Sequence, residues 1–112
     1  MIEQNRAACE AIRTAIGALH AEAIELRCAN SLNVLATRPE KAFDIVFLDP
    51  PFRMGLIEPT LDRLLGFEWV RAGSKIYIEI ESDAPRLEIS SNWRVLKSGT
   101  AGEVTYYLWE RN

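Results

Sequence analysis

The stretch IVFLDPPF, from Ile45 to Phe52, limits the possible folds more than any other part of the sequence. Its four successive apolar residues predict a strand that is buried on both faces, as in a parallel sheet. Proline has no N–H for a sheet hydrogen bond, and Pro51 restricts Pro50 to extended conformations. The strand must therefore end at Asp49, so a carboxylate lies at its carboxyl end. The rest of the sequence has to indicate whether this carboxylate marks a turn or a reaction site.

The remaining sequence alternates between helical and strand patterns. Helices are predicted from the cap Asn5 to about His20, from Ser31 to near Pro39, and from Leu56 to Leu65 with Gly66 as the C-terminal cap. Strands are predicted over 23–28, 42–49 and 74–82, followed by the strands 92–98 and 103–111, which a turn at 99–102 joins into a hairpin. Alternating helices and strands predict an α/β fold with a Rossmann-like, doubly wound parallel sheet, to which the hairpin adds an antiparallel edge. We expect residues 1–112 to form a single domain, with ligands beyond the carboxyl ends of the strands.

Composition and charge exclude several classes of protein. The 48% hydrophobic content argues against disorder, and the net charge of −3 is spread evenly, without the basic stripe of many nucleic-acid-binding domains. Cys9 and Cys28 lie too far apart in sequence for a usual zinc cluster, so no metal site is predicted. We interpret both cysteines as buried free thiols in a reducing compartment. No signal peptide and no membrane span are predicted, which favours a cytoplasmic location.

The residues that follow the apolar strand suit methyl transfer to an exocyclic amine of a nucleobase. Such a nitrogen is a poor nucleophile, because its lone pair is delocalised into the ring. The carboxylate of Asp49 and the carbonyl of Pro50 could accept its two N–H groups and stabilise the charge that develops during attack. Pro50 and Pro51 would stiffen the loop, and Phe52 could stack on the base.

The stretch DIVFLDPPF resembles the catalytic motif of S-adenosylmethionine-dependent amino-methyltransferases. The longer segments DIVFLDPPFRMGLIEPTLDRLL, IYIEIES and NWRVLKSGTAGEVTYYLWER are similar to 16S ribosomal RNA guanine-N2 methyltransferases of the RsmD type. This resemblance implies a class I methyltransferase fold, S-adenosylmethionine as cofactor, and ribosomal RNA or the small ribosomal subunit as partner. It also implies that Asp49, Pro50, Pro51 and Phe52 are the catalytic residues.

The resemblance assigns further residues to cofactor and substrate. Glu3 corresponds to the acid that binds the ribose hydroxyls of the cofactor, while Asn30, Ser31 and Leu32 correspond to the strand end that meets the adenine. Asn30 or Ser31 could equally cap the helix that follows. Arg53 could contact substrate phosphate beside Phe52, or it could be a solvated loop residue. Trp69, Trp93 and Trp109 are interpreted as core residues, and His20 as structural.

The sequence covers only the C-terminal part of the RsmD-type fold. None of its six glycines forms a GxG pair, so we expect the N-terminal strand and the glycine-rich cofactor loop to be missing. Loss of that strand is expected to expose the apolar edge of the strand over 42–49. Two alternatives therefore stay open: a DNA adenine-N6 methyltransferase with the same motif, and a non-catalytic fragment that self-associates through the exposed strand.

Overall fold

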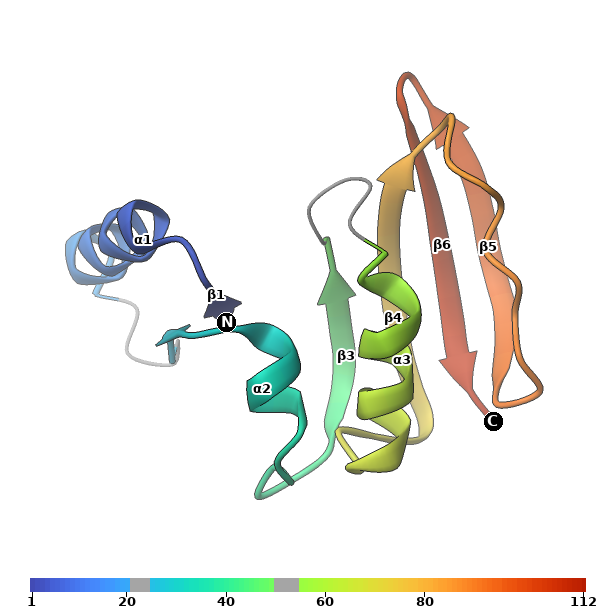
Figure 1. The fold of residues 1–112 in the computed structure, drawn as a ribbon, viewed down its shortest axis with the longest axis horizontal. Coiled ribbons are helices and arrows are strands. Elements are labelled where there is room, and N and C mark those ends of the chain that lie inside the picture. Colours follow the sequence, from blue (N-terminus) through green and yellow to red (C-terminus); the bar gives the residue numbers. More distant parts are fainter. Residues whose placement is uncertain (21–24, 50–54) are drawn as a thin grey trace. The chain divides into compact units, whose positions relative to one another are not determined.

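The computed structural model describes residues 1–20, 25–49 and 55–112, which form two compact units, 1–37 and 38–112. Figure 1 shows a small helical and strand unit at the N-terminus and a larger unit built on a sheet. The expectation of a single domain over 1–112 stays a prediction.

In the first unit, β1 (Ile2–Glu3) and β2 (Arg27–Cys28) form a parallel pair, connected through α1 (Arg6–Ala18) and followed by α2 (Ser31–Leu35). The predicted cap is confirmed, since Asn5 Oδ1 accepts a hydrogen bond from the N–H of Ala8 at 2.9 Å. Helix α1 ends two residues before the predicted end, because His20 has a left-handed backbone with φ of 50°. Strand β1 was not predicted from the pattern, since two residues are too few to show alternation.

Cys9 and Cys28 are joined in a disulfide, so the prediction of two free thiols is wrong. Parallel pairing sets Cys28 beside Glu3, and the first turn of α1 brings Cys9 back toward the same strands. Their Cα atoms lie 5.9 Å apart, within the range that a disulfide spans. Cys9 is fully buried as predicted, whereas Cys28 is half-buried. A cross-link that closes a loop of this size typically contributes about 3 kcal/mol of stability.

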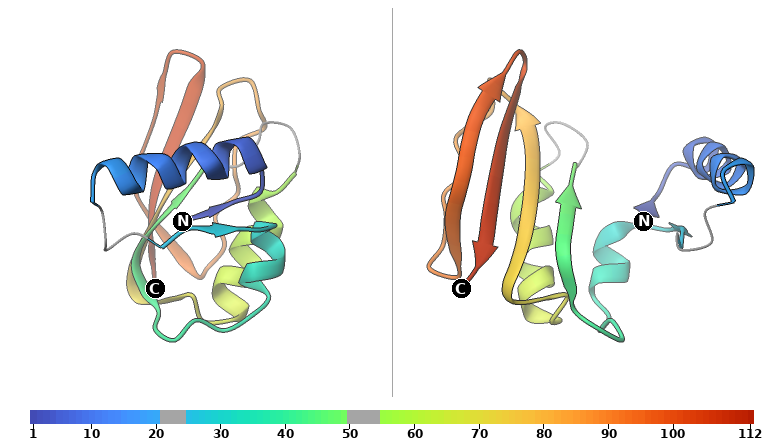
Figure 2. Two further views of the ribbon diagram at one scale, coloured as in Figure 1. Left: turned by 90° about the vertical axis from the view of Figure 1, so that its left-hand side faces the viewer. Right: turned by 180° about the vertical axis from the view of Figure 1, so that it is seen from behind.

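The second unit is a four-stranded mixed sheet with one helix in the described chain. Its elements are β3 (Phe43–Leu48), α3 (Ile57–Gly66), β4 (Val70–Glu81), β5 (Trp93–Ala101) and β6 (Val104–Arg111), and the strand order is β3-β4-β6-β5. Strands β3 and β4 are parallel, while β4, β6 and β5 are antiparallel neighbours (Figure 2). The predicted C-terminal hairpin and mixed sheet are therefore confirmed.

The core of this unit lies on the face of the sheet that bears Ile76, Ile78 and Ile80 of β4. Successive strand residues point to opposite faces, so these three isoleucines share one face, and at most 6% of each is exposed. Helix α3 packs against β4 and buries Leu64 and Thr60 (Figure 1). The side chains of Trp69, Trp93 and Trp109 are buried, which confirms the prediction that they belong to the core.

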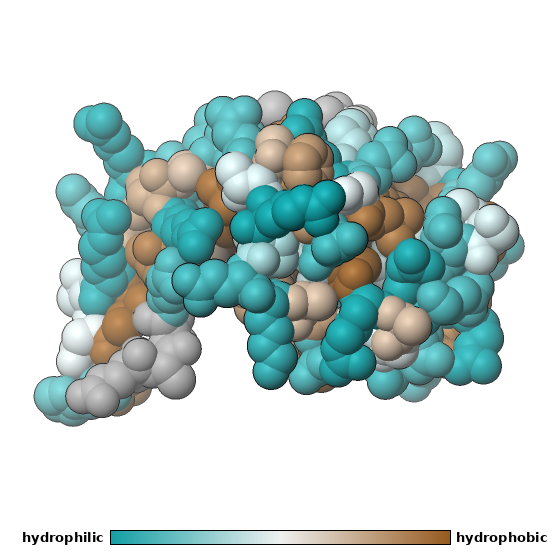
Figure 3. All heavy atoms as spheres, turned by 90° about the horizontal axis from the view of Figure 1, so that it is seen from below, coloured by the Kyte–Doolittle hydropathy of each residue, from teal (hydrophilic) through white to brown (hydrophobic). Residues whose placement is uncertain are grey.

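Strand β3 is not buried on both faces, contrary to the prediction. Phe43, Ile45 and Phe47 are 52%, 56% and 78% exposed, whereas the alternate residues Val46 and Leu48 are half-buried. Burial on both faces requires a covering layer on each face, and the exposed fractions show that the face of β3 bearing these three residues has none among the described residues. In the described chain β3 also has a strand neighbour on one edge only, namely β4. The expected exposure of this apolar strand is thus observed. Figure 3 shows that apolar residues also reach the surface between hydrophilic ones on the side of the molecule that it draws.

Helix α3 ends in a different way from that predicted. Gly66 is the last helical residue and not the residue beyond it, and Glu68 instead takes the left-handed backbone with φ of 62°. The N–H of Trp69 donates to the Leu64 carbonyl at 3.0 Å, and the N–H of Glu68 donates to that of Leu65 at 3.4 Å. This is a Schellman motif, which satisfies carbonyls that the helix end would leave unpaired.

The hairpin turn is shorter than predicted and lies closer to the C-terminus. Gly102 and Glu103 form a two-residue turn between the paired residues Ala101 and Val104, and Gly102 supplies the positive φ of 61°. Gly99 lies within β5 opposite Tyr106, where an added Cβ would come within 2.6 Å of the Tyr106 hydroxyl oxygen. A side chain at position 99 would therefore have to displace the Tyr106 ring, so Gly99 is explained by the tyrosine that covers it and not by a turn.

Strand β4 begins four residues before the predicted start, and Ser74 makes this extension compatible with the sheet. The register between β3 and β4 shifts between Phe43 and Ile45. Ser74 is 1% exposed, donates to the Phe43 carbonyl at 2.7 Å and accepts from the N–H of Arg71 at 2.9 Å. Its hydroxyl thus satisfies two backbone groups that the irregular register leaves without ladder partners.

Replacing Ser74 with alanine should lower the free energy of unfolding by about 1–3 kcal/mol, since two partly buried backbone groups lose their partner. Urea denaturation followed by circular dichroism would measure the loss. Ser98→Ala, at an exposed position of β5, is the matched control and should change the midpoint little. Equal midpoints for the two variants would show that the Ser74 hydroxyl does not support the register shift.

Candidate functional site

The candidate residues within the described chain follow the carboxyl ends of parallel strands. Glu3 is the last residue of β1, Asn30 lies two residues after β2, and Asp49 directly follows β3. The first unit therefore brings Glu3 and Asn30 to the same end of one strand pair, and Asp49 lies at the end of β3 in the second unit. Pro50, Pro51, Phe52 and Arg53 lie outside the described residues.

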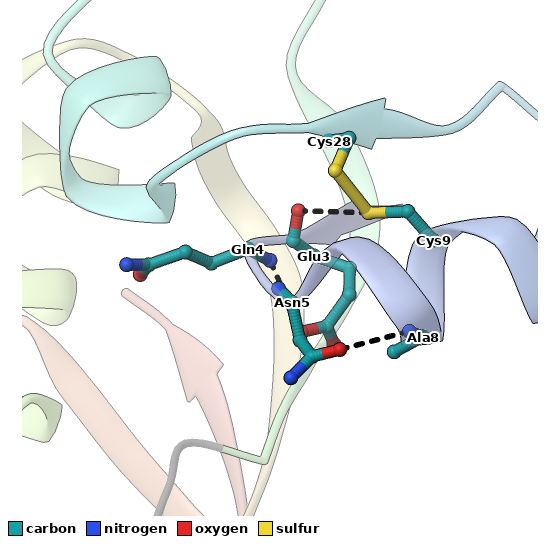
Figure 4. Close-up of a disulfide and its surroundings, with 6 residues drawn as sticks. All are labelled: Glu3, Gln4, Asn5, Ala8, Cys9 and Cys28. Atoms are coloured by element: carbon teal, nitrogen blue, oxygen red, sulfur yellow. Dashed lines mark hydrogen bonds between the residues drawn. A yellow bond between two sulfur atoms is a disulfide. The ribbon is translucent and has the colours of Figure 1, made fainter.

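The turn from β1 into α1 holds the carboxylate of Glu3. Its Oε1 accepts hydrogen bonds from the N–H groups of Gln4 and Asn5, both at 3.0 Å (Figure 4). No described residue donates to Oε2, and the side chain is only half-buried. One oxygen therefore fixes the orientation of the carboxylate, while the other can accept hydrogen bonds from a ligand. A fixed, two-lobed acceptor of this kind suits a diol.

Asn30 caps α2, which confirms the alternative that this residue caps the helix that follows. Its Oδ1 accepts from the N–H of Asn33 at 3.2 Å, and its Nδ2 donates to Gln4 Oε1 at 3.4 Å. The side chain is exposed, and its amide orientation is set by two partners on different segments. Ser31 and Leu32 form the first turn of α2 and are half-buried. The predicted adenine contacts of these three residues stay predictions.

Gln4 is a residue at this end of the strand pair that the sequence patterns did not indicate. Its side chain links the end of β1 to the residue that caps α2. The available signal was its position, because Gln4 directly follows Glu3, which the resemblance assigns to the cofactor. A glutamine carries no motif of its own, and its partner is 26 residues away in the sequence.

Asp49 is exposed at the end of a strand that is itself well fixed. Residues Ile45 to Leu48 pair in continuous parallel register with Lys75 to Ile78 of β4. The carboxylate is thus attached to an ordered strand, and α3 begins at Ile57 on the far side of the DPPF segment. This strand, acid and helix order is the context that the sequence predicted for the motif.

Two further properties of the described chain bear on the class of site. No group of three or more histidine, cysteine, aspartate or glutamate side chains in the described ranges could hold a metal ion. None of the described helices is long and apolar enough to cross a membrane.

A family profile described as "Conserved hypothetical protein 95" matches residues 1–110. Its match covers nearly the whole sequence and includes both units. The chain belongs to this family, that of the RsmD homologues.

Curated relatives of this RsmD homologue are named "Ribosomal RNA small subunit methyltransferase D". The Escherichia coli K12 protein is 32% identical over 111 residues, which are 99% of this chain and 56% of the relative. The Haemophilus influenzae protein is 43% identical over 68 residues, which are 61% of this chain and 35% of the relative. The RsmD homologue thus spans about half the length of these relatives, or less.

Solved structures share the fold of this RsmD homologue. A proposed methyltransferase from Escherichia coli matches with a TM-score of 0.87 and 32% identity, over 99% of this chain and 60% of its own. A proposed methylase from Haemophilus influenzae matches with a TM-score of 0.86 and 30% identity, over 98% of this chain and 70% of its own. The α/β fold with antiparallel C-terminal strands is therefore that of methyltransferase structures.

Substitutions at Asn30 can separate its capping bond from its bond to Gln4. Asn30→Ala should lower the free energy of unfolding by about 1 kcal/mol, because the N–H of Asn33 loses its acceptor. Asn30→Ser also loses the amide that donates to Gln4 but keeps a capping oxygen, so its stability should stay within about 0.5 kcal/mol of the native value. Urea denaturation would measure both changes. Equal losses in the two variants would contradict the capping role.

Proposed function

We propose that this chain is part of an S-adenosylmethionine-dependent enzyme that methylates the exocyclic N2 amine of a guanine in 16S ribosomal RNA. The observation that carries the proposal is the position of Asp49, at the end of an ordered parallel strand and at the start of a DPPF segment. Membership of the RsmD family, with relatives named as ribosomal RNA small subunit methyltransferases, supports the choice of substrate.

In the proposed reaction, Asp49 and the Pro50 carbonyl accept the two N–H groups of the guanine amine. This positions the nitrogen and stabilises the positive charge that it gains during attack. Phe52 stacks on the base, Pro51 keeps the loop rigid, and Arg53 contacts substrate phosphate. Asp49 need not be a strong base, because the proton can leave to water once the nitrogen carries the methyl group.

The proposed cofactor residues are Glu3, Asn30, Ser31 and Leu32. S-adenosylmethionine would supply an activated methyl group. The oriented carboxylate of Glu3, with Oε2 free of donors in the described chain, fits the ribose diol. Asn30 would bond the adenine edge through lone pairs that the cap leaves unused, and Leu32 would pack on the ring.

The proposed partner is ribosomal RNA within the small ribosomal subunit, and the proposed location is the cytoplasm. The target guanine must leave its base stack to reach Asp49, which is easiest in a single-stranded region. The chain spans about half of its curated relatives, and it contains no GxG segment that could cradle the methionine part of the cofactor. We therefore assign the complete activity to a protein that also contains that loop.

Asp49→Ala should abolish methylation in a version of the chain extended upstream through the glycine-rich loop of its relatives. The amine loses an acceptor that acts during the chemical step, and a loss of about a hundredfold or more is typical for such groups. Transfer of labelled methyl groups to small ribosomal subunits would measure turnover. Calorimetric titration with S-adenosylmethionine should give nearly unchanged affinity, since Asp49 is not among the proposed cofactor residues.

Asp62→Ala, on helix α3, is a matched control that removes an acid of the same unit and should retain turnover. Unchanged turnover of Asp49→Ala would overturn the catalytic assignment. Methylation of adenine in duplex DNA, in place of guanine in ribosomal RNA, would favour the DNA methyltransferase alternative.

A second candidate function, self-association of the chain, is favoured by the exposed face of β3. Ile45 and Phe47 point away from the buried face of the sheet, and Phe47 contacts Tyr77 with ring centroids 6.0 Å apart. The Tyr77 hydroxyl donates to Glu79 Oε1 at 2.9 Å, which raises the pKa of Tyr77. An exposed apolar edge strand is a template for pairing with another chain, so two copies could associate through β3.

Phe47→Asp should reduce self-association of the 112-residue chain, because a charge at the centre of an apolar contact is costly to desolvate. Analytical ultracentrifugation over a range of concentrations would measure the shift toward monomer. Leu19→Asp is the matched control, since Leu19 is 76% exposed and lies in the other unit. A monomeric native chain at every concentration would exclude this candidate.

A further inference from the structure

The disulfide lies against the residue that holds the proposed ribose-binding carboxylate. Figure 4 shows the disulfide between Cys9 of α1 and Cys28 of β2 beside Glu3, from which the chain turns into α1. The N–H of Arg27 donates to the Met1 carbonyl at 2.9 Å, and the N–H of Ala29 donates to the Glu3 carbonyl at 2.8 Å. Each strand of this pair has only two residues. The disulfide from α1 to β2 is therefore a large part of what holds β1, α1 and β2 together.

The two cysteine residues differ in their exposure to solvent. Cys9 is 0% exposed, whereas Cys28 is half-buried at the end of β2. Thiol–disulfide exchange requires an incoming thiolate to reach one sulfur atom. A small thiol can therefore attack Cys28, and Cys9 becomes the leaving group, which stays inside the unit.

Breaking the disulfide would also change the bonding at the backbone of Glu3. Cys9 Sγ lies 3.4 Å from the Glu3 carbonyl oxygen. A disulfide sulfur has no hydrogen to donate, but a Cys9 thiol at this position can donate a weak S–H hydrogen bond to that carbonyl. The same carbonyl accepts from the N–H of Ala29, so the thiol would act directly on a bond between β1 and β2.

We propose that Cys9 and Cys28 are a reversible thiol–disulfide switch that sets how firmly the β1–α1 turn holds the Glu3 carboxylate. In the oxidised state the cross-link holds α1 against β2, and the turn between β1 and α1 is fixed at both ends. In the reduced state that turn depends on short strands and hydrogen bonds alone. The effect on cofactor affinity rests on the proposed function, whereas the effect on the turn does not.

The switching reaction balances with a low-molecular-weight disulfide, such as oxidised glutathione, as the oxidant. The thiolate of Cys28 attacks one glutathione sulfur, which forms a mixed disulfide and releases one glutathione thiol. The thiolate of Cys9 then attacks Cys28 Sγ and displaces the second glutathione thiol. Two electrons pass from the protein to the glutathione disulfide, and reduction follows the same steps in reverse.

The first test is amide hydrogen exchange of the full 112-residue chain in its oxidised and reduced states, measured by NMR. The amides of Arg27 and Ala29, which join β1 to β2, should exchange about tenfold faster or more after reduction, since local opening becomes easier. The amide of Ile78 in the core of β4 should exchange at the same rate in both states. Equal rates at Arg27 and Ala29 in the two states would overturn the proposal.

Cys28→Ser should show the reduced-state rates even in oxidising buffer. Ala18→Ser, at the exposed end of the same helix, should keep the rates of the native chain. In mixtures of reduced and oxidised glutathione, alkylation and mass spectrometry should find both states of the native pair. A pair that stays oxidised in excess reduced glutathione, or that never oxidises, would overturn reversibility.

Titration with S-adenosylmethionine then tests the consequence for the site. Tighter binding in the oxidised state would support control of the cofactor site, and equal affinity in both states would overturn that part. This titration uses the version extended upstream through the glycine-rich loop, because the proposed function assigns the complete activity to a protein with that loop. Binding in neither state would count against the proposed function. The exchange rates would then still decide whether the pair controls the turn.

Discussion

The burial of Ile76, Ile78 and Ile80 on one face of β4 is the constraint on which the larger unit depends. These side chains fix which face of β4 meets α3, and a shift of one residue would move all of them to the solvent side. The register of β4 in turn sets the register of β3 on one edge and of β6 on the other. The residue of β4 beside which β3 ends, and therefore the position of Asp49 within its sheet, follows from this packing.

Patterns that repeat within one element predicted much of this structure. The isoleucine alternation predicted β4, the apolar spacing and Asn5 predicted α1, and the short glycine-bearing turn between the last two strand patterns predicted the hairpin. Each of these signals arises from neighbours a few residues away, which the sequence displays directly. The positions of Asn30 and Asp49 after predicted strands were correct for the same reason, whereas that of Glu3 came from the family resemblance. The ligands of all three residues depend on chemistry that backbone placement does not test.

The predictions that were wrong concern contacts between distant residues or details of the backbone. The spacing of Cys9 and Cys28 carries no information on how α1 packs beside β2, so the disulfide was not predicted. The apolar run of β3 indicated burial, but burial requires covering elements that a strand pattern cannot supply. Glu68 accepted the left-handed conformation that was assigned to glycine, because the following Trp69 is held in the core.

The two-residue turn at Gly102 and Glu103 has a consequence for engineering the chain. Exposed hairpin tips are commonly used to insert tags or sensor domains, since few contacts are lost there. Here the Glu103 carbonyl accepts a hydrogen bond from the N–H of Ser82 at 2.8 Å, directly after the end of β4. The tip therefore also holds the residue that follows β4. A domain inserted between Gly102 and Glu103 would break this contact and separate the hairpin from the chain that leaves β4.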